Sequence, residues 1–347
     1  MKNRWLLLGL LLVMAGGLVF TVAYTQGGDR VLTAVKVTQV PTINGVGDDD
    51  AWKNAPGVNI PVLAGANFDG KGGTTVELRA VYTDTTVYFL AQWVDPTEST
   101  RRSPFQKQAD GTWKQLKDPN DKGGDNNIYY EDKLAIIWNV NDSIKGFNES
   151  GCFVLCHAGE NPDKKPYGNK YTASPGEIGD IWHWKGVRTG SVGQIDDQYV
   201  DNTRYDPDKA PEAGRKSDPR FFGGYADNTL ADGKPKWAAP ENKPAPPYWI
   251  YDNAKVALDD SKYKAGDEVP GILVAPFLGD RGDLAAKAVW KDGKWTLEWG
   301  RKLNTASPFD VQFTDFNKSY FFGVAAFDNA QVRHAFNAGA YELKFAK

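Results

Sequence analysis

The strongest constraint on the fold is a series of short segments in which apolar and polar residues alternate with a period of two. Alternation of this kind is typical of half-buried β-strands. The clearest segments form two predicted hairpins: residues 75–82 with 87–94, and residues 288–290 with 295–299. The first pair is joined through Asp84-Thr85-Thr86 and the second through Asp292-Gly293, a dipeptide that favours tight hairpin turns. These segments predict antiparallel sheet.

Further apolar segments extend the predicted sheet along the chain. Residues 132–139, 271–274, 321–327 and 340–345 have the apolar and aromatic content typical of strands. The composition agrees, because 36 Gly and 20 Pro residues supply many turns and 13% of the residues are aromatic. We therefore predict an all-β fold with the architecture of an immunoglobulin-like β-sandwich, formed by residues 31–347.

The middle of the chain differs from these segments. Residues 159–265 are rich in Pro, Gly, Asp, Lys and Asn and contain few apolar runs. We expect this region to form a large, loop-rich insertion within the sandwich. Long loops in a domain of this kind are often functional.

Residues 1–26 predict a segment that exports the chain. Lys2 and Arg4 precede residues 5–24, a mainly apolar stretch without charged residues that is long enough to cross a bilayer as a helix. We expect either a membrane anchor or a cleaved signal peptide, and a weak small-x-small site at Thr21-Val22-Ala23 fits the second. Both alternatives place the remaining chain in the periplasm or another extracytoplasmic compartment, and an anchor would hold it at the cytoplasmic membrane.

The only two cysteines lie in one short motif. Cys152 and Cys156 are separated by three residues, and His157 directly follows the second cysteine. In c-type cytochromes two cysteines form thioether bonds to the haem and the adjacent histidine ligates the iron, usually with the spacing C-x-x-C-H. Although the spacing here is one residue longer, we interpret the motif as the site of one covalent haem c with His157 as the proximal ligand. A disulfide is the main alternative, because a zinc site would need further Cys or His residues nearby.

Few residues can supply a second ligand to the iron. Met1 and Met14 both lie in the N-terminal segment, so the exported part contains no methionine. The chain has three histidines, which leaves His183 and His334 beside His157. His183 is closer to the motif in sequence, and His334 lies between the last two predicted strands. A lysine ligand and an open iron site are the remaining alternatives.

Several short motifs follow one another in a characteristic order: residues 43–52, 81–95, 180–188 with 194–197, 295–303 and 327–331. In this order they resemble the haem-binding domain family of the ethylbenzene dehydrogenase gamma subunit, which includes cytochrome c-552-like and dimethyl-sulfoxide-reductase-like haem-binding domains. The resemblance covers nearly the whole exported part. It implies a β-sandwich related to carbohydrate-binding family 9 and to the cytochrome of cellobiose dehydrogenase, with a haem at one end.

The resemblance also implies a partner and a ligand position. The expected partner is a molybdenum enzyme of the dimethyl-sulfoxide-reductase type, another cytochrome or another respiratory protein. The gamma subunits bind a non-covalent b haem through Met and Lys, whereas this chain has the Cys–Cys–His motif and no available Met. Family geometry places the other ligand late in the chain, which favours His334, while closeness to the motif favours His183.

These features favour an exported monohaem c-type cytochrome, an electron-transfer protein or subunit rather than an enzyme, that passes single electrons to or from a respiratory oxidoreductase. The formal net charge of −3 gives no electrostatic reason to expect nucleic acid as a partner. Two alternatives stay open. One is a carbohydrate- or surface-binding sandwich, which exposed tryptophans in a cleft would support, and the other is a haem sensor with an open iron site.

Overall fold

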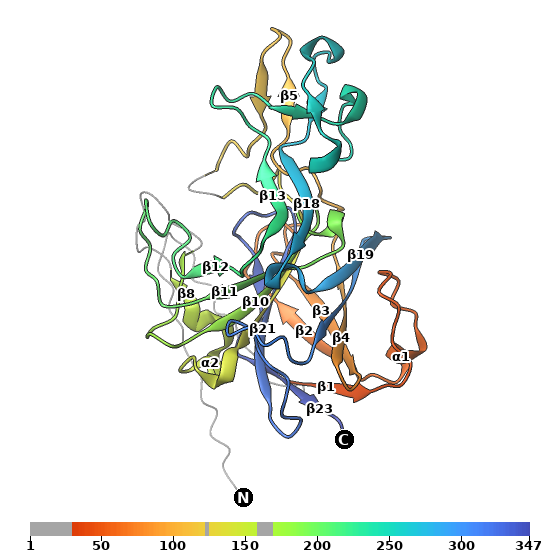
Figure 1. The fold of residues 1–347 in the computed structure, drawn as a ribbon, viewed down its shortest axis with the longest axis vertical. Helices are drawn as coiled ribbons and strands as arrows, with labels where there is room; N and C mark the ends of the chain where they lie inside the picture. The colour runs from red at the N-terminus through yellow and green to blue at the C-terminus, as the bar shows by residue number, and fades with distance from the viewer. Residues whose placement is uncertain (1–29, 122–124, 158–168) are drawn as a thin grey trace, which may run out of the picture.

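The computed structural model describes residues 30–121, 125–157 and 169–347, and most of their regular structure is β-strand (Figure 1). The segment 1–26, expected to be an anchor or signal peptide, lies outside these residues. Across the described ranges, no helix has the length and apolar character needed to cross a membrane.

Thirteen strands form the main sheet. They are β1 (Val31–Lys36), β2 (Val58–Val62), β3 (Thr74–Tyr82), β4 (Thr86–Val94), β7 (Lys133–Asn139), β10 (Gly179–Lys185), β11 (Asp196–Val200), β12 (Arg215–Ser217), β19 (Ala285–Lys291), β20 (Lys294–Lys302), β21 (Tyr320–Phe327), β22 (Ala335–Phe336) and β23 (Tyr341–Phe345). The two predicted hairpins are confirmed, because β3 pairs antiparallel with β4 and β19 pairs antiparallel with β20.

The main sheet forms the two layers of a sandwich. Its order is β12-β11-β10-β7-β21-β23-β1-β3-β4-β20-β19, with β2 added beside β3 and β22 beside β21. β1 links the layers, since it pairs in parallel with both β23 and β3. At the far edge, the Ala286 amide donates to the Gly193 carbonyl (2.9 Å) and the Ile195 amide to the Leu284 carbonyl (3.0 Å). The predicted all-β sandwich is therefore confirmed.

Aromatic side chains fill the space between the layers. Phe89 of β4 stacks on Trp299 of β20, with ring centroids 5.1 Å apart, and meets the edge of Trp182 of β10 at 5.5 Å. Trp93 of β4 meets Trp184 of β10 in the same way at 6.0 Å. Large aromatic rings remove much apolar surface from water, so this layer of rings stabilises the contact between the two halves of the sheet.

Several small sheets extend the molecule beyond one end of the sandwich, at the top of Figure 1. Their strands are β5 (Phe105–Lys107), β6 (Trp113–Gln115), β13 (Phe222–Asp227), β14 (Trp237–Ala238), β15 (Ile250–Tyr251), β16 (Val256–Ala257), β17 (Glu268–Val269) and β18 (Ile272–Leu278). Distant parts of the sequence meet here, since β17 pairs with β5 and β15 pairs with β18.

The remaining elements are short. They are the strand pair β8 (Cys156–His157) and β9 (Asn169–Lys170), the helices α1 (Asp50–Lys53) and α2 (Phe147–Ser150), and the 3₁₀ turns η1 (Val140–Asp142), η2 (Gly151–Leu155), η3 (Gly190–Val192), η4 (Pro240–Asn242), η5 (Asp252–Ala254), η6 (Asp260–Lys262) and η7 (Asp280–Gly282).

The region expected to be a loop-rich insertion, residues 159–265, contributes to both parts of the molecule. Residues 159–168 lie outside the described ranges. β10, β11 and β12 belong to the main sheet, and the later strands belong to the small sheets. All seven residues of β10 are buried, because β10 is an internal strand that is covered on both faces. Its sequence therefore lacks the polar–apolar alternation by which a half-buried strand is recognised.

Candidate functional site

The Cys–Cys–His motif lies over the outer face of the layer that contains β7, β10 and β21. After β7 the chain forms α2 and η2, and Cys152 and Leu155 pack with Ile137 and Ile181 of the sheet. Cys152 lies against Gly323 of β21, where an added Cβ atom would be 3.3 Å from the Cys152 Cβ. A glycine at this position therefore lets the motif approach the sheet closely.

The two cysteines are free thiols in close contact. Cys156 Sγ lies 3.5 Å from the Cys152 carbonyl oxygen, and Lys170 Nζ donates a hydrogen bond to the same sulfur at 3.4 Å. A hydrogen bond from the Cys152 thiol, together with the charge of Lys170, lowers the pKa of Cys156 well below its usual value. The hydrogen bond to Cys156 and burial raise the pKa of Cys152. Cys156 is therefore the more nucleophilic of the two sulfurs.

His157 has a fixed ring and a free nitrogen. β8 pairs with β9, and the imidazole stacks on Tyr171 with ring centroids 3.7 Å apart and an interplanar angle of 4°. The Arg204 guanidinium lies over the same tyrosine ring at 3.9 Å. The Nε2 atom of His157 is buried and has no hydrogen-bond partner. A buried nitrogen without a partner is costly, and a metal ligand bond would satisfy it.

His183 has a second buried imidazole nitrogen without a hydrogen-bond partner. It lies on the outer face of β10, and its Nδ1 is 3.3 Å from Oε1 of Gln198. Its Nε2 is buried and has no partner. Burial lowers the pKa of His183 well below its usual value, so the imidazole is neutral at pH 7. A neutral imidazole held through Nδ1 and free at Nε2 is the usual form of a histidine metal ligand.

Small side chains lie beside His183 on this face. In register, His183 is opposite Ala135 of β7, and Ala135 is opposite Ala325 of β21. Both alanines are only partly buried, although their strands are internal to the sheet. We call Ala135 and Ala325 the alanine patch. It places only small side chains beside His183 on this face.

His334 lies on the side of the patch nearer the motif. Its Nδ1 is 2.9 Å from the Val332 carbonyl oxygen, and its ring lies 6.0 Å from that of Phe336, which in turn stacks near Phe153. Burial and the charge of Lys170 lower the pKa of His334 to about 4. The Cys156 sulfur is close enough to His334 for the two groups to influence each other's pKa.

The structure therefore brings most of the sequence-predicted site residues to one face. Phe327 connects the two candidate distal histidines, since its ring centroid is 5.6 Å from that of His183 and 4.9 Å from that of His334. Lys133 lies here as well, with Nζ 3.9 Å from the Phe327 centroid and a 2.8 Å hydrogen bond to the Gln331 carbonyl. Sequence reasoning missed Phe327 and Lys133, because only the pairing of β7 with β21 brings them together, and it missed Lys170, which the short β8–β9 pair places beside Cys156.

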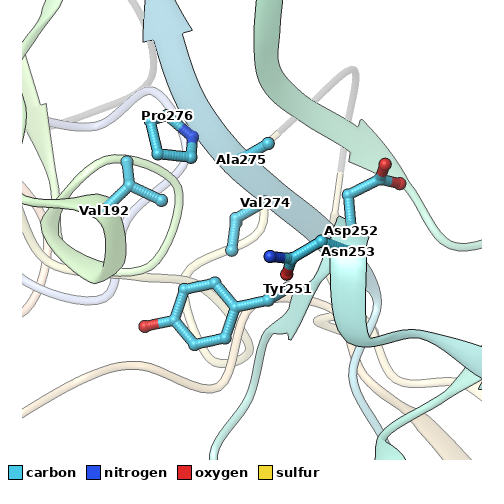
Figure 2. A pocket seen from close by; sticks show the side chains of 7 residues that line it. All are labelled: Val192, Tyr251, Asp252, Asn253, Val274, Ala275 and Pro276. Atoms are coloured by element: carbon cyan, nitrogen blue, oxygen red, sulfur yellow. The ribbon is translucent and has the colours of Figure 1, made fainter.

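A separate pocket lies at the junction with the small sheets. The volume of this pocket is about 470 Å³. Its lining residues, shown in Figure 2, are Val192, Tyr251, Asp252, Asn253, Val274, Ala275 and Pro276. Its lining contains neither cysteine and none of the three histidines. It also contains no tryptophan, and every tryptophan of the described ranges is buried or half-buried. The exposed tryptophans that a carbohydrate-binding cleft would need are therefore not found in this part of the chain.

Solved structures of low sequence identity align with most of this chain. A carbohydrate-binding module of family 9 from Caldicellulosiruptor kristjanssonii, in complex with glucose, is 11% identical, with a TM-score of 0.35 and coverage of 91% of this chain and 95% of the module. A putative carbohydrate-binding protein from Bacteroides uniformis is 7% identical, with a TM-score of 0.35 and coverage of 92% and 100%.

Sequence comparison identifies the family. No curated protein matches the chain. The family model described as ethylbenzene dehydrogenase matches residues 49–338, which include the motif, both candidate distal histidines and all the strands of the main sheet except β1 and β23. Since this match spans most of the sequence, the chain belongs to the ethylbenzene dehydrogenase family.

Proposed function

We propose that the protein is an exported monohaem c-type cytochrome that passes single electrons to or from a respiratory oxidoreductase. The observation that carries the proposal is the combination of two free thiols in the motif with two imidazoles, His157 directly after the second thiol and His183 on the sheet face beneath the motif, whose buried Nε2 atoms have no partner. Thiols and neutral imidazoles are the groups that hold a haem c. Family membership associates the chain with an oxidoreductase complex, and we propose a molybdenum enzyme of the dimethyl-sulfoxide-reductase type, or another cytochrome, as the redox partner.

In this proposal each residue of the motif has a distinct role. Cys152 and Cys156 would hold the porphyrin covalently, and Cys156, with its lowered pKa, is the more reactive thiol. His157 would ligate the iron, with its ring oriented by its stack on Tyr171. Bound there, the haem would supply a one-electron redox centre whose potential depends on its ligands and burial.

His183 is the proposed second ligand. Its Nε2 is buried and unpaired, and Gln198 fixes the orientation of its ring through Nδ1. His334, which lies near the Cys156 sulfur, is the alternative ligand. Lys133 is the weaker alternative, because its Nζ already donates to the Gln331 carbonyl. The alanine patch places only small side chains beside His183.

The test is a spectrum of the purified protein, produced with a cytochrome c maturation system. We expect haem that stays bound to the denatured chain, and a reduced spectrum that carbon monoxide does not change. Haem that is fully extracted by acidified solvent would overturn covalent attachment. Rapid carbon monoxide binding by the wild type would overturn the two-histidine arrangement.

Variants at the two candidate ligands identify the second one. We expect His183→Ala to open the iron to carbon monoxide, whereas the matched variant His334→Ala keeps the spectrum of the wild type. The reverse result would make His334 the ligand. If neither variant binds carbon monoxide, Lys133→Ala is the next change to measure, and a response there would replace His183 in the proposal.

Export is a further part of the proposal, and it depends on residues 1–26. A fusion of alkaline phosphatase after residue 30 should be active, because that enzyme needs an oxidising compartment to form its disulfides. An inactive phosphatase fusion would contradict export of the chain.

A further inference from the structure

A cluster of buried carboxylates lies on the opposite face of β10 from the candidate haem residues. Asp180 of β10, Asp197 of β11 and Asp310, from the loop before β21, have exposures of 0%, 0% and 2%, and each contributes a carboxylate oxygen within 4.8 Å of the others. Asp218, 2% exposed, is a fourth member, because its carboxylate interacts directly with that of Asp310. We call these four residues the inner carboxylate cluster.

Some carboxylate oxygens of the inner carboxylate cluster have hydrogen-bond or ion-pair partners, and the others have none. Asp180 Oδ2 accepts a hydrogen bond from the Val311 amide (2.9 Å) and lies 3.8 Å from Arg301 Nη2. Asp310 Oδ2 accepts from Thr305 Oγ1 (2.6 Å) and from Arg301 Nη2 (2.8 Å). In both Asp180 and Asp310, only the Oδ2 atom of the carboxylate takes part in these contacts.

The other oxygens of the cluster have no partner. The buried, unpaired atoms are Asp180 Oδ1, Asp310 Oδ1, both carboxylate oxygens of Asp197 and both carboxylate oxygens of Asp218. A buried carboxylate oxygen without a donor is rare and costs free energy. Asp197 is the clearest case, since it is fully buried and the groups that contact its carboxylate, Asp180 and Asp283, are themselves carboxylic acids.

The inner carboxylate cluster also contains more negative groups than the buried cation beside it can neutralise. Arg301, which is 1% exposed, is the buried cation that contacts the cluster, and it offsets one of the four carboxylates. Burial raises the pKa of Asp180 to about 7 and that of Asp218 to about 9. The cluster must therefore either retain protons at neutral pH or bind a cation.

We propose that the inner carboxylate cluster binds a divalent cation, Ca²⁺, through the unpaired oxygens of Asp180, Asp197, Asp218 and Asp310. The donors are all carboxylate oxygens, and Ca²⁺ takes about 6–8 oxygen ligands at roughly 2.3–2.6 Å. Arg301 positions Asp180 and Asp310 so that each presents its other oxygen to the ion. The ion would connect β10 and β11 to the loop before β21. Binding of the ion would therefore stabilise the folded sandwich.

A second acidic triad provides an internal contrast. Asp95, Asp132 and Asp328 are also buried and close together. Most of their oxygens accept hydrogen bonds. Asp132 accepts from the Ser99 amide and Trp295 Nε1 through Oδ2 and from the Asn329 amide through Oδ1. Asp328 accepts from the Phe68 amide through Oδ2 and from Thr97 Oγ1 through Oδ1, and Asp95 Oδ1 accepts from the Thr97 amide. Only Asp95 Oδ2 has no partner among the oxygens of this triad. This triad fixes loops, and we assign it no ion.

The test is a calcium titration of the complete, haem-loaded protein after treatment with a chelator. We expect one Ca²⁺ per chain by calorimetry and by elemental analysis, with weaker binding of Mg²⁺. Asp197→Asn should weaken Ca²⁺ binding at least tenfold, and Asp218→Asn provides an independent variant if the first does not fold. The matched control, Asp95→Asn in the other triad, should bind Ca²⁺ as the wild type does.

Two results would overturn the proposal. The first is a wild-type protein that binds no Ca²⁺ and whose melting temperature is the same in calcium and in chelator, which would mean that protons neutralise the cluster. The second is undiminished binding in both Asp197→Asn and Asp218→Asn, which would place the ion elsewhere. The haem spectrum is recorded in the same samples, so failure of this proposal is distinguishable from failure of the haem proposal.

Discussion

The two faces of β10 show two different ways of using a buried strand. Ile181, His183 and Lys185 lie on the outer face, and Asp180, Trp182 and Trp184 lie on the inner face. The outer face has an unpaired imidazole nitrogen beside the small side chains of the alanine patch. The inner face is filled with aromatic rings and has unpaired carboxylate oxygens at its end. An imidazole nitrogen beside small side chains suits the iron of a flat cofactor, whereas close packing with hard oxygen donors suits a single small ion.

The largest expected effect is on the outer face. In the double variant Cys152→Ser and Cys156→Ser, all covalent haem should be lost, because oxygen cannot replace sulfur in the thioether bonds. Haem staining of a denaturing gel measures this directly. Each single variant should retain one thioether bond, and covalent haem in the double variant would show that the motif does not attach it.

The next effect compares packing on the two faces. Trp182→Ala on the inner face should reduce the free energy of unfolding by about 3–5 kcal/mol, because it removes a fully buried ring from the core. Ile181→Val on the outer face should cost only about 0.5–1.5 kcal/mol. Urea unfolding, followed by tryptophan fluorescence for Ile181→Val and by circular dichroism for both, measures the difference. Equal losses would contradict the assignment of the main core to the inner face.

The inner carboxylate cluster should make stability depend on pH and calcium together. The pKa of Asp180 is raised to about 7 and that of Asp218 to about 9, so the folded chain holds protons that the unfolded chain releases. In chelator, the free energy of unfolding should therefore fall as pH rises from about 4 to 9. Saturating Ca²⁺ should remove most of this decline. A decline that calcium leaves unchanged would contradict an ion in the cluster.

His334 on the outer face should produce the opposite slope at lower pH. Its pKa is about 4 in the folded chain and near 6.5 when unfolded, so the unfolded chain binds the proton more readily. In the haem-free double cysteine variant, stability should rise with pH between about 4 and 6.5, by an amount of order 2 kcal/mol. Adding His334→Gln should reduce this rise and leave the part that the lowered pKa of His183 contributes, and an unchanged slope would assign the whole rise to another group.

The smallest expected effect concerns the close approach of the motif to the sheet. A Cβ atom at position 323 would lie 3.3 Å from the Cys152 Cβ and 3.5 Å from Asn337 Oδ1. Gly323→Ala should therefore cost about 1 kcal/mol, typical of mild overpacking. Thermal unfolding of the haem-loaded protein checks this.

The sequence contains enough local information to predict the hairpins and the motif. The β3–β4 and β19–β20 hairpins depend on alternation and on turns such as Asp292-Gly293, which are short-range signals. The spacing of Cys152, Cys156 and His157 is equally local. Each of these features can be recognised without knowledge of which distant strands pair.

Features that depend on long-range pairing could not be predicted. β10 is buried on both faces, so its sequence shows no polar face, and we placed it within an insertion. The alanine patch exists only because β7 pairs with both β10 and β21. The inner carboxylate cluster likewise combines Asp180 and Asp310, which are far apart in sequence and individually ordinary.

The parallel pairing of β1 with β23 has a consequence for how the chain matures. The first strand of the sandwich joins its two layers only when the last strand is present, since β23 lies between β21 and β1. β21, β22 and His334, which border the alanine patch, also come from the final part of the chain. During export the cysteines would thus emerge well before the surface that encloses them, and we expect this interval to give the haem-attaching machinery access to both thiols.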